Sequence, residues 1–333
     1  MQPVLTFTDS GIYCPAGDFY IDPWKPVDRA VITHAHSDHA RWGNKKYLCT
    51  KDSVPLLQLR LGQDIAVEGA GWGETVQING AAVSFHPAGH MIGSAQVKVT
   101  VGGQTWVASG DYKTENDGIS GQFEPIRCHV FITESTFGLP IYHWRPQSAL
   151  FKDMEDWMKE NDNAGKNSIL LGYSLGKAQR LLYNLQHTGR HFLVHGAIYN
   201  AHEVLLKAGW NLPPVELITP DTPKERFKNS LVIAPPSTAD STWMRKLAPY
   251  SLGVCSGWMQ VRGNSRRMNA DAGFAISDHA DWQGLLSTIK ETGAEKVFVT
   301  HGFSSVLARY LQEHNIQAEE IKTAFGTEEE TTA

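Results

Sequence analysis

The sequence contains no apolar run that approaches the ~20 residues needed to cross a bilayer as a helix. Its first residues, MQPVLTFTDSGIYCP, also lack the basic stretch followed by a long apolar stretch that marks a secretory signal. These two absences argue against a membrane partner and predict a protein of the cytoplasm.

Cysteine is scarce, and no two cysteines form a C-x-x-C pair; the chain has Cys14, Cys49, Cys128 and Cys255. This spacing supplies neither a disulfide framework nor a zinc ribbon. We therefore expect reduced, buried thiols, and a metal site in this chain must be built from other side chains.

Basic residues are fewer than acidic residues, 30 against 35, so the formal net charge is −5. Such a balance gives no general attraction for a polyanion, so a nucleic-acid site would have to be a local basic patch. With 41% hydrophobic and 20% charged residues, the composition is that of an ordinary globular protein. At 333 residues it exceeds the usual size of one hydrophobic core, so two domains or an inserted module are expected.

Short apolar segments separated by Gly, Pro and Asp dominate the first 140 residues. They predict strands at 19–21, 30–32, 81–85, 96–99, 105–108 and 130–132. Gly102 and Gly103 predict a hairpin between two of these strands. Residues with chemically active side chains follow four strand ends: His34, His90, Asp111 and Glu134.

The sequence pattern changes near residue 141, and from there to about residue 262 predicted helices alternate with predicted strands. The pattern predicts helices within 149–158 and 178–185, strands at 168–171, 191–194 and 231–233, and a polar connector at 221–230. The strand-end pattern returns at 276–279 and 296–301, with a helix at 282–292 between them. We therefore predict a catalytic domain split into 1–140 and 263–333, with an α/β module at 141–262 inserted into it.

The segment THAHSDHA places four metal-capable side chains, His34, His36, Asp38 and His39, directly after the apolar stretch 30–32. A lone His is usually a core residue, but that interpretation does not explain four such groups together. Side chains two apart on an extended segment point the same way, so His34 and His36 can hold one ion together. Asp38 and His39 follow where the chain can turn into a helix, and they would face a neighbouring position.

Two later residues extend this pattern to a two-metal site. His90 lies in the Gly-flanked loop PAGHMIG, where the backbone can approach closely, and Asp111 ends a strand with a carboxylate that can bridge two ions. Imidazole and carboxylate donors suit zinc and also manganese or iron. Two ions about 4 Å apart can activate water and neutralise charge on a phosphoryl group.

The series H-x-H-x-D-H, a Gly-His loop and a Gly-Asp strand end resembles the metallo-β-lactamase superfamily. TESTFG at 133–138, ISDHADW at 276–282 and VTHG at 299–302 resemble the additional motifs of its β-CASP nucleases, and GYSLGKAQRLL at 172–182 resembles the first segment of their cap. The resemblance covers nearly the whole chain. It implies a metallo-β-lactamase αββα sandwich with an inserted β-CASP α/β cap domain.

Carried over position by position, the resemblance implies two divalent metal ions, Zn²⁺ and/or Mn²⁺. The ligands of one would be His34, His36 and His90, those of the other Asp38, His39 and His301, with Asp111 as the bridge. His279 would lie beside the scissile phosphate as general acid or transition-state stabiliser, with Glu134 fixing its orientation. The catalytic residues implied are therefore His279, Glu134 and Asp38.

Substrate-binding residues are predicted in two segments. Arg262, Arg266 and Arg267 precede His279 and supply a local basic patch, with Trp258 nearby for base stacking. The alternative is a solvated loop. Ser174 and Lys177, at a predicted helix start, could bind phosphate, although a plain helix start with surface charges is the competing interpretation.

Within the family, VRGNSRRMNADAGFAISDHADW and the compact length resemble the bacterial DNA exonucleases associated with DNA ligase. That resemblance implies trimming of single-stranded DNA from the 5′ end in DNA repair, with DNA preferred over RNA and a DNA ligase in the same pathway. His301 departs from the eukaryotic DNA-processing branch, where valine is common, and matches the RNA-processing branch. An endoribonuclease or RNA 3′-end processing enzyme therefore remains an alternative.

Two further classes are less consistent with the sequence. A catalytically silent β-CASP scaffold predicts eroded ligands, whereas every predicted ligand position is filled, as are Glu134 and His279. A hydrolase of small substrates would keep the metal loop but would have no use for the inserted module or the arginine cluster.

Overall fold

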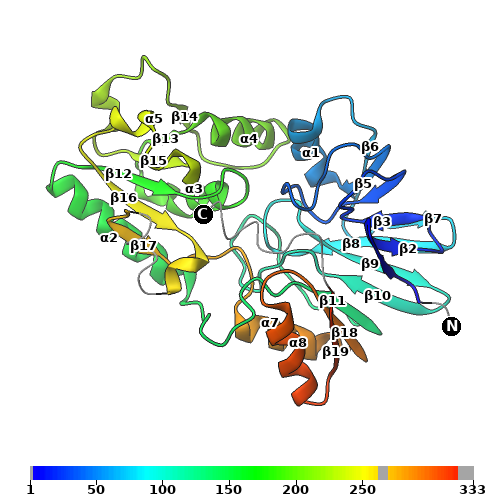
Figure 1. The fold of residues 1–333 in the computed structure, drawn as a ribbon. Coiled ribbons are helices and arrows are strands. Elements are labelled where there is room, and N and C mark those ends of the chain that lie inside the picture. Colours follow the sequence, from blue (N-terminus) through cyan, green and yellow to red (C-terminus); the bar gives the residue numbers. More distant parts are fainter. Residues whose placement is uncertain (1–2, 262–268, 322–333) are drawn as a thin grey trace. The chain divides into compact units, whose positions relative to one another are not determined.

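The computed structural model describes residues 3–261 and 269–321, which fall into two compact units (Figure 1). The first unit contains the chain up to Tyr142 and again from His279, and the second contains His143–Asp278. The chain therefore leaves the first unit once and returns to it. The domain limits expected from the sequence, 1–140 with 263–333 and 141–262, stay predictions.

The first unit contains a six-stranded sheet whose strands follow chain order. They are β1 (Thr6–Thr8), β2 (Gly11–Cys14), β3 (Phe19–Ile21), β4 (Arg29–Val31), β5 (Lys46–Thr50) and β6 (Val67–Ala70). The first three strands pair antiparallel, and the pairs from β3 onward are parallel. Helix α1 (Val54–Leu61) connects β5 to β6.

Its second sheet has seven strands in the order β19-β18-β11-β10-β9-β8-β7. They are β7 (Thr75–Ile78), β8 (Ala81–Pro87), β9 (Ala95–Val101), β10 (Gln104–Ala108), β11 (Val130–Thr133), β18 (Lys296–Val299) and β19 (Gln317–Glu320). The antiparallel pairing of Gln104 with Val101 confirms the hairpin predicted at Gly102-Gly103. The parallel pairing of β11 with β18 joins the two chain segments of this unit.

The alternation of side chains along β10 shows how this unit is layered. Trp106 and Ala108 point into a core shared with Ile21 and Val31 of the six-stranded sheet, so the two sheets face each other. Val107 points the opposite way, into a cluster with α7 (Trp282–Thr292) and α8 (Ser304–Glu313). Sheet, sheet and helices thus form successive layers, and the predicted mixed α/β class is confirmed.

Helix α7 has the limits that the sequence predicted, because local signals define both ends. Oδ1 of Asp281 accepts a hydrogen bond of 2.8 Å from the backbone N–H of Gly284, and Gly293 ends the helix in the left-handed conformation at φ 62°. The segment 221–230, which was predicted as a polar connector, contains the 3₁₀ helix η3 (Lys224–Phe227) in the structure. Phe227 is 1% exposed and anchors this turn in the core of the second unit.

The second unit has a wholly parallel sheet in the order β14-β13-β15-β12-β16-β17. Its strands are β12 (Asn167–Leu171), β13 (Phe192–Val194), β14 (Glu216–Leu217), β15 (Leu231–Ala234), β16 (Tyr250–Cys255) and β17 (Ala272–Phe274), and its helices are α2 (Gln147–Asn163), α3 (Lys177–Leu185), α4 (Gly196–Lys207) and α5 (Thr242–Arg245). Alternate residues of β12 enter apolar clusters on opposite faces. This explains the continuous apolar runs in these strands.

Short 3₁₀ turns complete the described elements: η1 (Lys51–Ser53), η2 (Gln186–Thr188), η4 (Pro236–Thr238) and η5 (Gly257–Gln260). Three of the cysteines are buried, as predicted, whereas Cys128 is half-buried, and all four are free thiols. None of the helices in the described ranges is long and apolar enough to pass through a bilayer.

Candidate metal centre

The predicted metal and catalytic residues of the first unit gather because several strands of its seven-stranded sheet end at one edge. β8, β10, β11 and β18 run in the same direction, so their carboxyl ends meet there. His90, Asp111, Glu134 and His301 follow these four strands, in that order. The loop from His34 to His39 follows β4 of the opposing sheet.

The first group of donor atoms consists of His34, His36, His90 and Asp111, which place one ligand atom each within 4.8 Å of one another. Nδ1 of His36 lies 3.1 Å from Nε2 of His34 and 3.1 Å from Nε2 of His90. Oδ2 of Asp111 lies 3.5 Å from Nε2 of His34. A tetrahedral ion with bonds of about 2.0–2.1 Å keeps its donor atoms ~3.3 Å apart, so these residues fit one.

The second group consists of Asp38, His39 and, again, Asp111. Nε2 of His39 is buried and makes no hydrogen bond within the described part of the chain. The Oδ2 atoms of Asp38 and Asp111 lie 3.5 and 3.4 Å from it. A cation bound between this nitrogen and the two carboxylates would satisfy all three groups.

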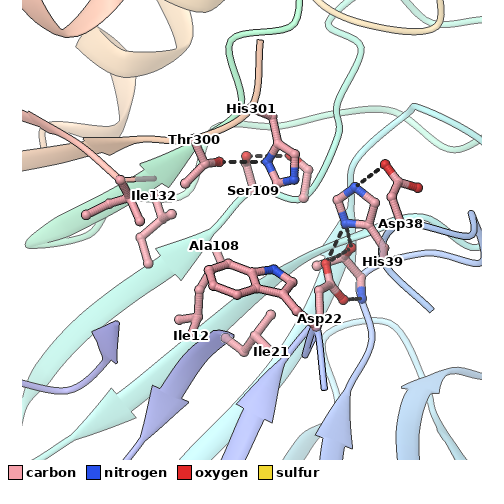
Figure 2. A pocket seen from close by; sticks show the side chains of 14 residues that line it. Ile12, Ile21, Asp22, Asp38, His39, Ala108, Ser109, Ile132, Thr300 and His301 are labelled. Carbon is pink, nitrogen blue, oxygen red and sulfur yellow. Dashed lines mark hydrogen bonds and ion pairs between the residues drawn. The ribbon is translucent and has the colours of Figure 1, made fainter. Parts of the chain in front are cut away.

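His301 lies beside the second group without belonging to the tightest set of donors. Its ring stacks on that of His39 with centroids 5.2 Å apart, and its Nδ1 is 3.1 Å from Oγ1 of Thr300 (Figure 2). Burial lowers the pKa of His301, and the neighbouring His39 lowers it further. Its imidazole is therefore neutral at neutral pH and available as a ligand.

The pKa values of three further donors are also shifted, in different directions. Burial lowers the pKa of His34 well below its usual range, and His39 adds to this effect. Burial acts on His39 in the same direction, but the carboxylates of Asp111, Asp38 and Asp22 outweigh it and raise its pKa well above the usual range. Burial favours the neutral form of Asp111, yet His39 overcomes this and holds the pKa of Asp111 well below normal. The cluster is a His/Asp site able to bind divalent metal.

Asp22, which sequence analysis did not select, orients His39. Its Oδ2 lies 2.7 Å from Nδ1 of His39 and accepts from Oγ1 of Thr33, while its Oδ1 accepts from the Thr33 N–H at 2.8 Å. A carboxylate at Nδ1 fixes the tautomer that leaves Nε2 as the ligand atom. The available signal was its position directly after β3, the same strand-end pattern that marked the other site residues.

Arg60 was also missed, and it holds the backbone of the metal loop. Its Nη1 donates to the carbonyl of Ala35 at 2.5 Å and to that of Ala40 at 3.4 Å. The loop makes one helical hydrogen bond, from the N–H of Ala40 to the carbonyl of His36, instead of the helix that the sequence allowed.

Glu134 and His279 form a hydrogen-bonded pair next to the first donor group. Nδ1 of His279 lies 2.9 and 3.1 Å from the two carboxylate oxygens of Glu134, which is 2% exposed. The N–H of Tyr112 donates to Oε1 of Glu134 at 2.7 Å, and Tyr112 directly follows Asp111. The ring of His279 lies 4.6 Å from that of His90. One edge of the sheet thus carries both the donor cluster and this pair.

Two glycines allow the chain to turn at the site. A Cβ on Gly89, which precedes His90 and has φ 73°, would lie 2.5 Å from the carbonyl oxygen of Lys113. A Cβ on Gly302, which follows His301 and has φ 68°, would lie 2.4 Å from the carbonyl oxygen of Ser135. Neither position accommodates another residue without displacement of the backbone.

A small cavity of about 40 Å³ adjoins the second donor group (Figure 2). Its polar wall is formed by Asp22, Thr33, Asp38, His39, Ser109, Thr300 and His301, and its apolar wall includes Ile12, Ile21, Ala108 and Ile132. The volume suits water and not a nucleotide.

The predicted substrate-binding residues belong to other parts of the chain. Arg262, Arg266 and Arg267 lie outside the described residues. Ser174 is half-buried, and its carbonyl accepts from Nε2 of Gln179. Lys177 is 4% exposed, and its ammonium group lies 3.0 Å from both the Ile276 carbonyl and Oδ2 of Asp278. Binding of phosphate by these residues stays a prediction.

Comparison with known proteins finds nucleic-acid enzymes among the relatives of this chain, although no family model matches it. A probable DNA ligase of Opitutus terrae is 29% identical over 310 residues, which are 92% of this chain and 30% of that protein. An RNase J-like protein of Methanocaldococcus jannaschii is 27% identical over 47% of this chain and 43% of its own length. The chain thus spans less than half of each of these relatives.

One solved structure supports the fold alone. A protein of unknown function from Enterococcus faecalis V583 has a TM-score of 0.62 and 12% identity, covering 90% of this chain and 80% of its own. The endoribonuclease YSH1 of Gibberella zeae is a further relative in sequence, 28% identical over 52% of this chain and 20% of its own length. Together with the His/Asp cluster and the Glu134–His279 pair, these relatives support the resemblance of the chain to the metallo-β-lactamase-fold β-CASP nucleases.

Proposed function

We propose that this chain is a metal-dependent DNA exonuclease that hydrolyses phosphodiester bonds from the 5′ end of single strands, in DNA repair and in the cytoplasm. The observation that carries the proposal is the hydrogen bond between Glu134 and His279 beside a group of metal donors. An acid–base pair next to bound cations is what phosphodiester hydrolysis requires, because charge on phosphorus and on the departing oxygen must be neutralised together.

In this proposal His34, His36 and His90 would hold one divalent ion, Asp38, His39 and His301 would hold a second, and Asp111 would serve as a ligand in both groups. The shared position of Asp111 in the two donor groups supports this arrangement. When bound, such ions lower the pKa of water and neutralise charge on a phosphoryl group. Asp22 supports this arrangement through its hydrogen bond to the ring of His39, and Arg60 supports it through its hydrogen bonds to the backbone of the metal loop.

His279 supplies the proton to the departing 3′ oxygen. Glu134 accepts a hydrogen bond from Nδ1, so Nε2 is the atom that carries the transferable proton. As water attacks phosphorus and releases one proton to solvent, the bond between phosphorus and the 3′ oxygen breaks, and the proton on Nε2 of His279 moves to that oxygen. Before this proton transfer, the carboxylate of Glu134 stabilises the positively charged ring of His279. It also fixes the direction in which Nε2 points.

DNA is the proposed substrate because a relative that aligns with 92% of this chain is named a probable DNA ligase. We accordingly propose that a DNA ligase acts in the same pathway. Arg262, Arg266 and Arg267 would bind phosphates of the strand, with Ser174 as an additional candidate. Cleavage of RNA is the second candidate function, favoured by the RNase J-like and YSH1 relatives and by the histidine at position 301.

Degradation of end-labelled single-stranded DNA and of RNA of the same sequence, with Mn²⁺ or Zn²⁺, tests the proposal. A label at the 5′ end should appear first as a mononucleotide or a short product, while a label at the 3′ end should appear in a ladder that shortens with time. The variant His279→Ala should lose this activity, and His187→Ala, at an exposed histidine of the second unit, should keep it.

Cleavage of RNA alone would replace the first candidate by the second. Cleavage of neither substrate by protein that contains metal would contradict both, and release of mononucleotides from the 3′ end would contradict the proposed polarity.

A further inference from the structure

A buried cluster of charges in the second unit suggests a role for two cations of α3. Nζ of Lys177 lies 3.0 Å from Oδ2 of Asp278, and Nη1 of Arg180 lies 2.7 Å from Oδ1 of the same carboxylate. Lys177, Arg180 and Asp278 are 4%, 1% and 5% exposed. Two cations of one helix therefore share one carboxylate away from solvent.

The same two side chains also bind the backbone directly before Asp278. Nζ of Lys177 donates to the carbonyl of Ile276 at 3.0 Å, and Nη1 of Arg180 donates to that of Ser277 at 2.6 Å. Residues 275–281 belong to no helix or strand, so no regular ladder holds this segment. The cations thus fix the positions of three consecutive residues, 276–278.

Arg180 is held in turn from a second helix. Oε1 of Gln147, at the start of α2, accepts from Nε of Arg180 at 3.0 Å and from Nη2 at 2.6 Å. The planar guanidinium group therefore bonds an amide, a carbonyl and a carboxylate in one fixed arrangement, which a lysine could not reproduce. The segment 276–278 is connected through Arg180 to the core of the second unit.

A buried cluster with two positive charges and one negative charge is costly to maintain, which makes a purely stabilising role a poor explanation. Binding of phosphate by Lys177 is also disfavoured, because its ammonium group is buried and already contacts a carboxylate and a carbonyl. The position of the fixed segment in the chain offers a better explanation. Residue 279, directly after it, is the histidine that pairs with Glu134.

We propose that Lys177 and Arg180 are positioning residues, which hold residues 276–278 in one conformation so that His279 enters its pairing with Glu134 in a single orientation. This inference deepens the proposed function and rests on it for its kinetic consequence. Without the clamp formed by Lys177, Arg180 and Asp278, the backbone at 278 would sample several conformations. The ring of His279 would then be correctly oriented for only part of the time.

The variant Lys177→Met tests the clamp, because it removes the ammonium group while leaving Arg180 and Asp278 as a balanced pair. It should therefore fold, which its thermal unfolding curve would verify. Lys152→Met is the matched control, since Lys152 is an exposed lysine of α2 in the same unit. Hydrogen exchange of full-length protein should be faster in peptides covering 277–281 by about 10-fold in Lys177→Met and unchanged in the control.

Kinetics on single-stranded DNA give the second readout. Lys177→Met should lower kcat by about 10- to 100-fold with KM within a factor of two, because only the orientation of an acid is disturbed. In a His279→Ala background the same substitution should cause no further loss, since the residue acts through His279.

Unchanged exchange at 277–281 in Lys177→Met would overturn the clamp. A raised KM and a weaker salt dependence at unchanged kcat would overturn it in favour of a phosphate contact, and additive losses with His279→Ala would contradict action through that residue. If the unaltered protein degraded no nucleic acid, the proposed function would fail, while the exchange comparison would still decide whether the clamp exists.

Discussion

The two units each contain a buried polar cluster, and the two clusters differ in what they lack. In the first unit, imidazoles and carboxylates converge on a common centre, and Nε2 of His39 has no hydrogen-bond partner among the described residues. In the second unit, Lys177 and Arg180 are matched by Asp278 and by backbone carbonyls. The first cluster is able to bind a cation, whereas the second contains its own cations, which hydrogen-bond to a segment of backbone.

Removal of the Asp111 carboxylate, which is common to both donor groups, should cause the largest loss of activity and of bound metal in the first unit. Asp111→Asn keeps the size of the side chain but weakens both groups, so activity should fall by about 10³-fold or more together with metal content. Elemental analysis of purified protein measures the metal. Full metal occupancy in Asp111→Asn would show that the two groups do not share this ligand.

Removal of the proposed general acid, His279, should reduce turnover without reducing metal binding. His279→Ala should lower turnover by about 10²-fold or more while metal content stays at the level of the unaltered protein, because Glu134 and His279 lie beside the donors without completing them. Turnover and elemental analysis are measured on the same preparation. Loss of metal from this variant would place His279 among the ligands.

An intermediate effect is expected at Asp22, which touches a ligand and not the ion. Asp22→Asn should weaken metal affinity by about 10- to 100-fold, because Nδ1 of His39 loses the carboxylate that fixes its tautomer. Competition with a chelator of known affinity measures the change. Asp9→Asn, a substitution near the start of the same unit, is the control and should bind metal normally.

The metal loop and part of the strands could be predicted because their signals are local, whereas strands such as β1, β5 and β16 were not predicted. Helix α7 has its cap at Asp281 and its stop at Gly293, and H-x-H-x-D-H lies within six residues. Asp22 was missed because its partner is seventeen residues away and its own segment contains no second ligand. The clamp was beyond prediction for the same reason, since Lys177 and Asp278 are brought together only by the tertiary fold.

The smallest predicted effect concerns the basic segment before His279. Arg266→Ala with Arg267→Ala should weaken binding of single-stranded DNA and reduce the slope of log affinity against log salt by about 1.4, if each arginine neutralises one phosphate. Fluorescence anisotropy at several salt concentrations measures this slope. An unchanged slope would show that these arginines bind no phosphate, and it would favour the alternative interpretation of this segment as a solvated loop.

Anomalous diffraction from crystals of the protein grown with Mn²⁺ tests the central claim most directly. The account predicts two peaks about 4 Å apart, one near His34, His36 and His90 and one near Asp38 and His39, with Asp111 between them. A single peak, or peaks away from Asp111, would contradict it.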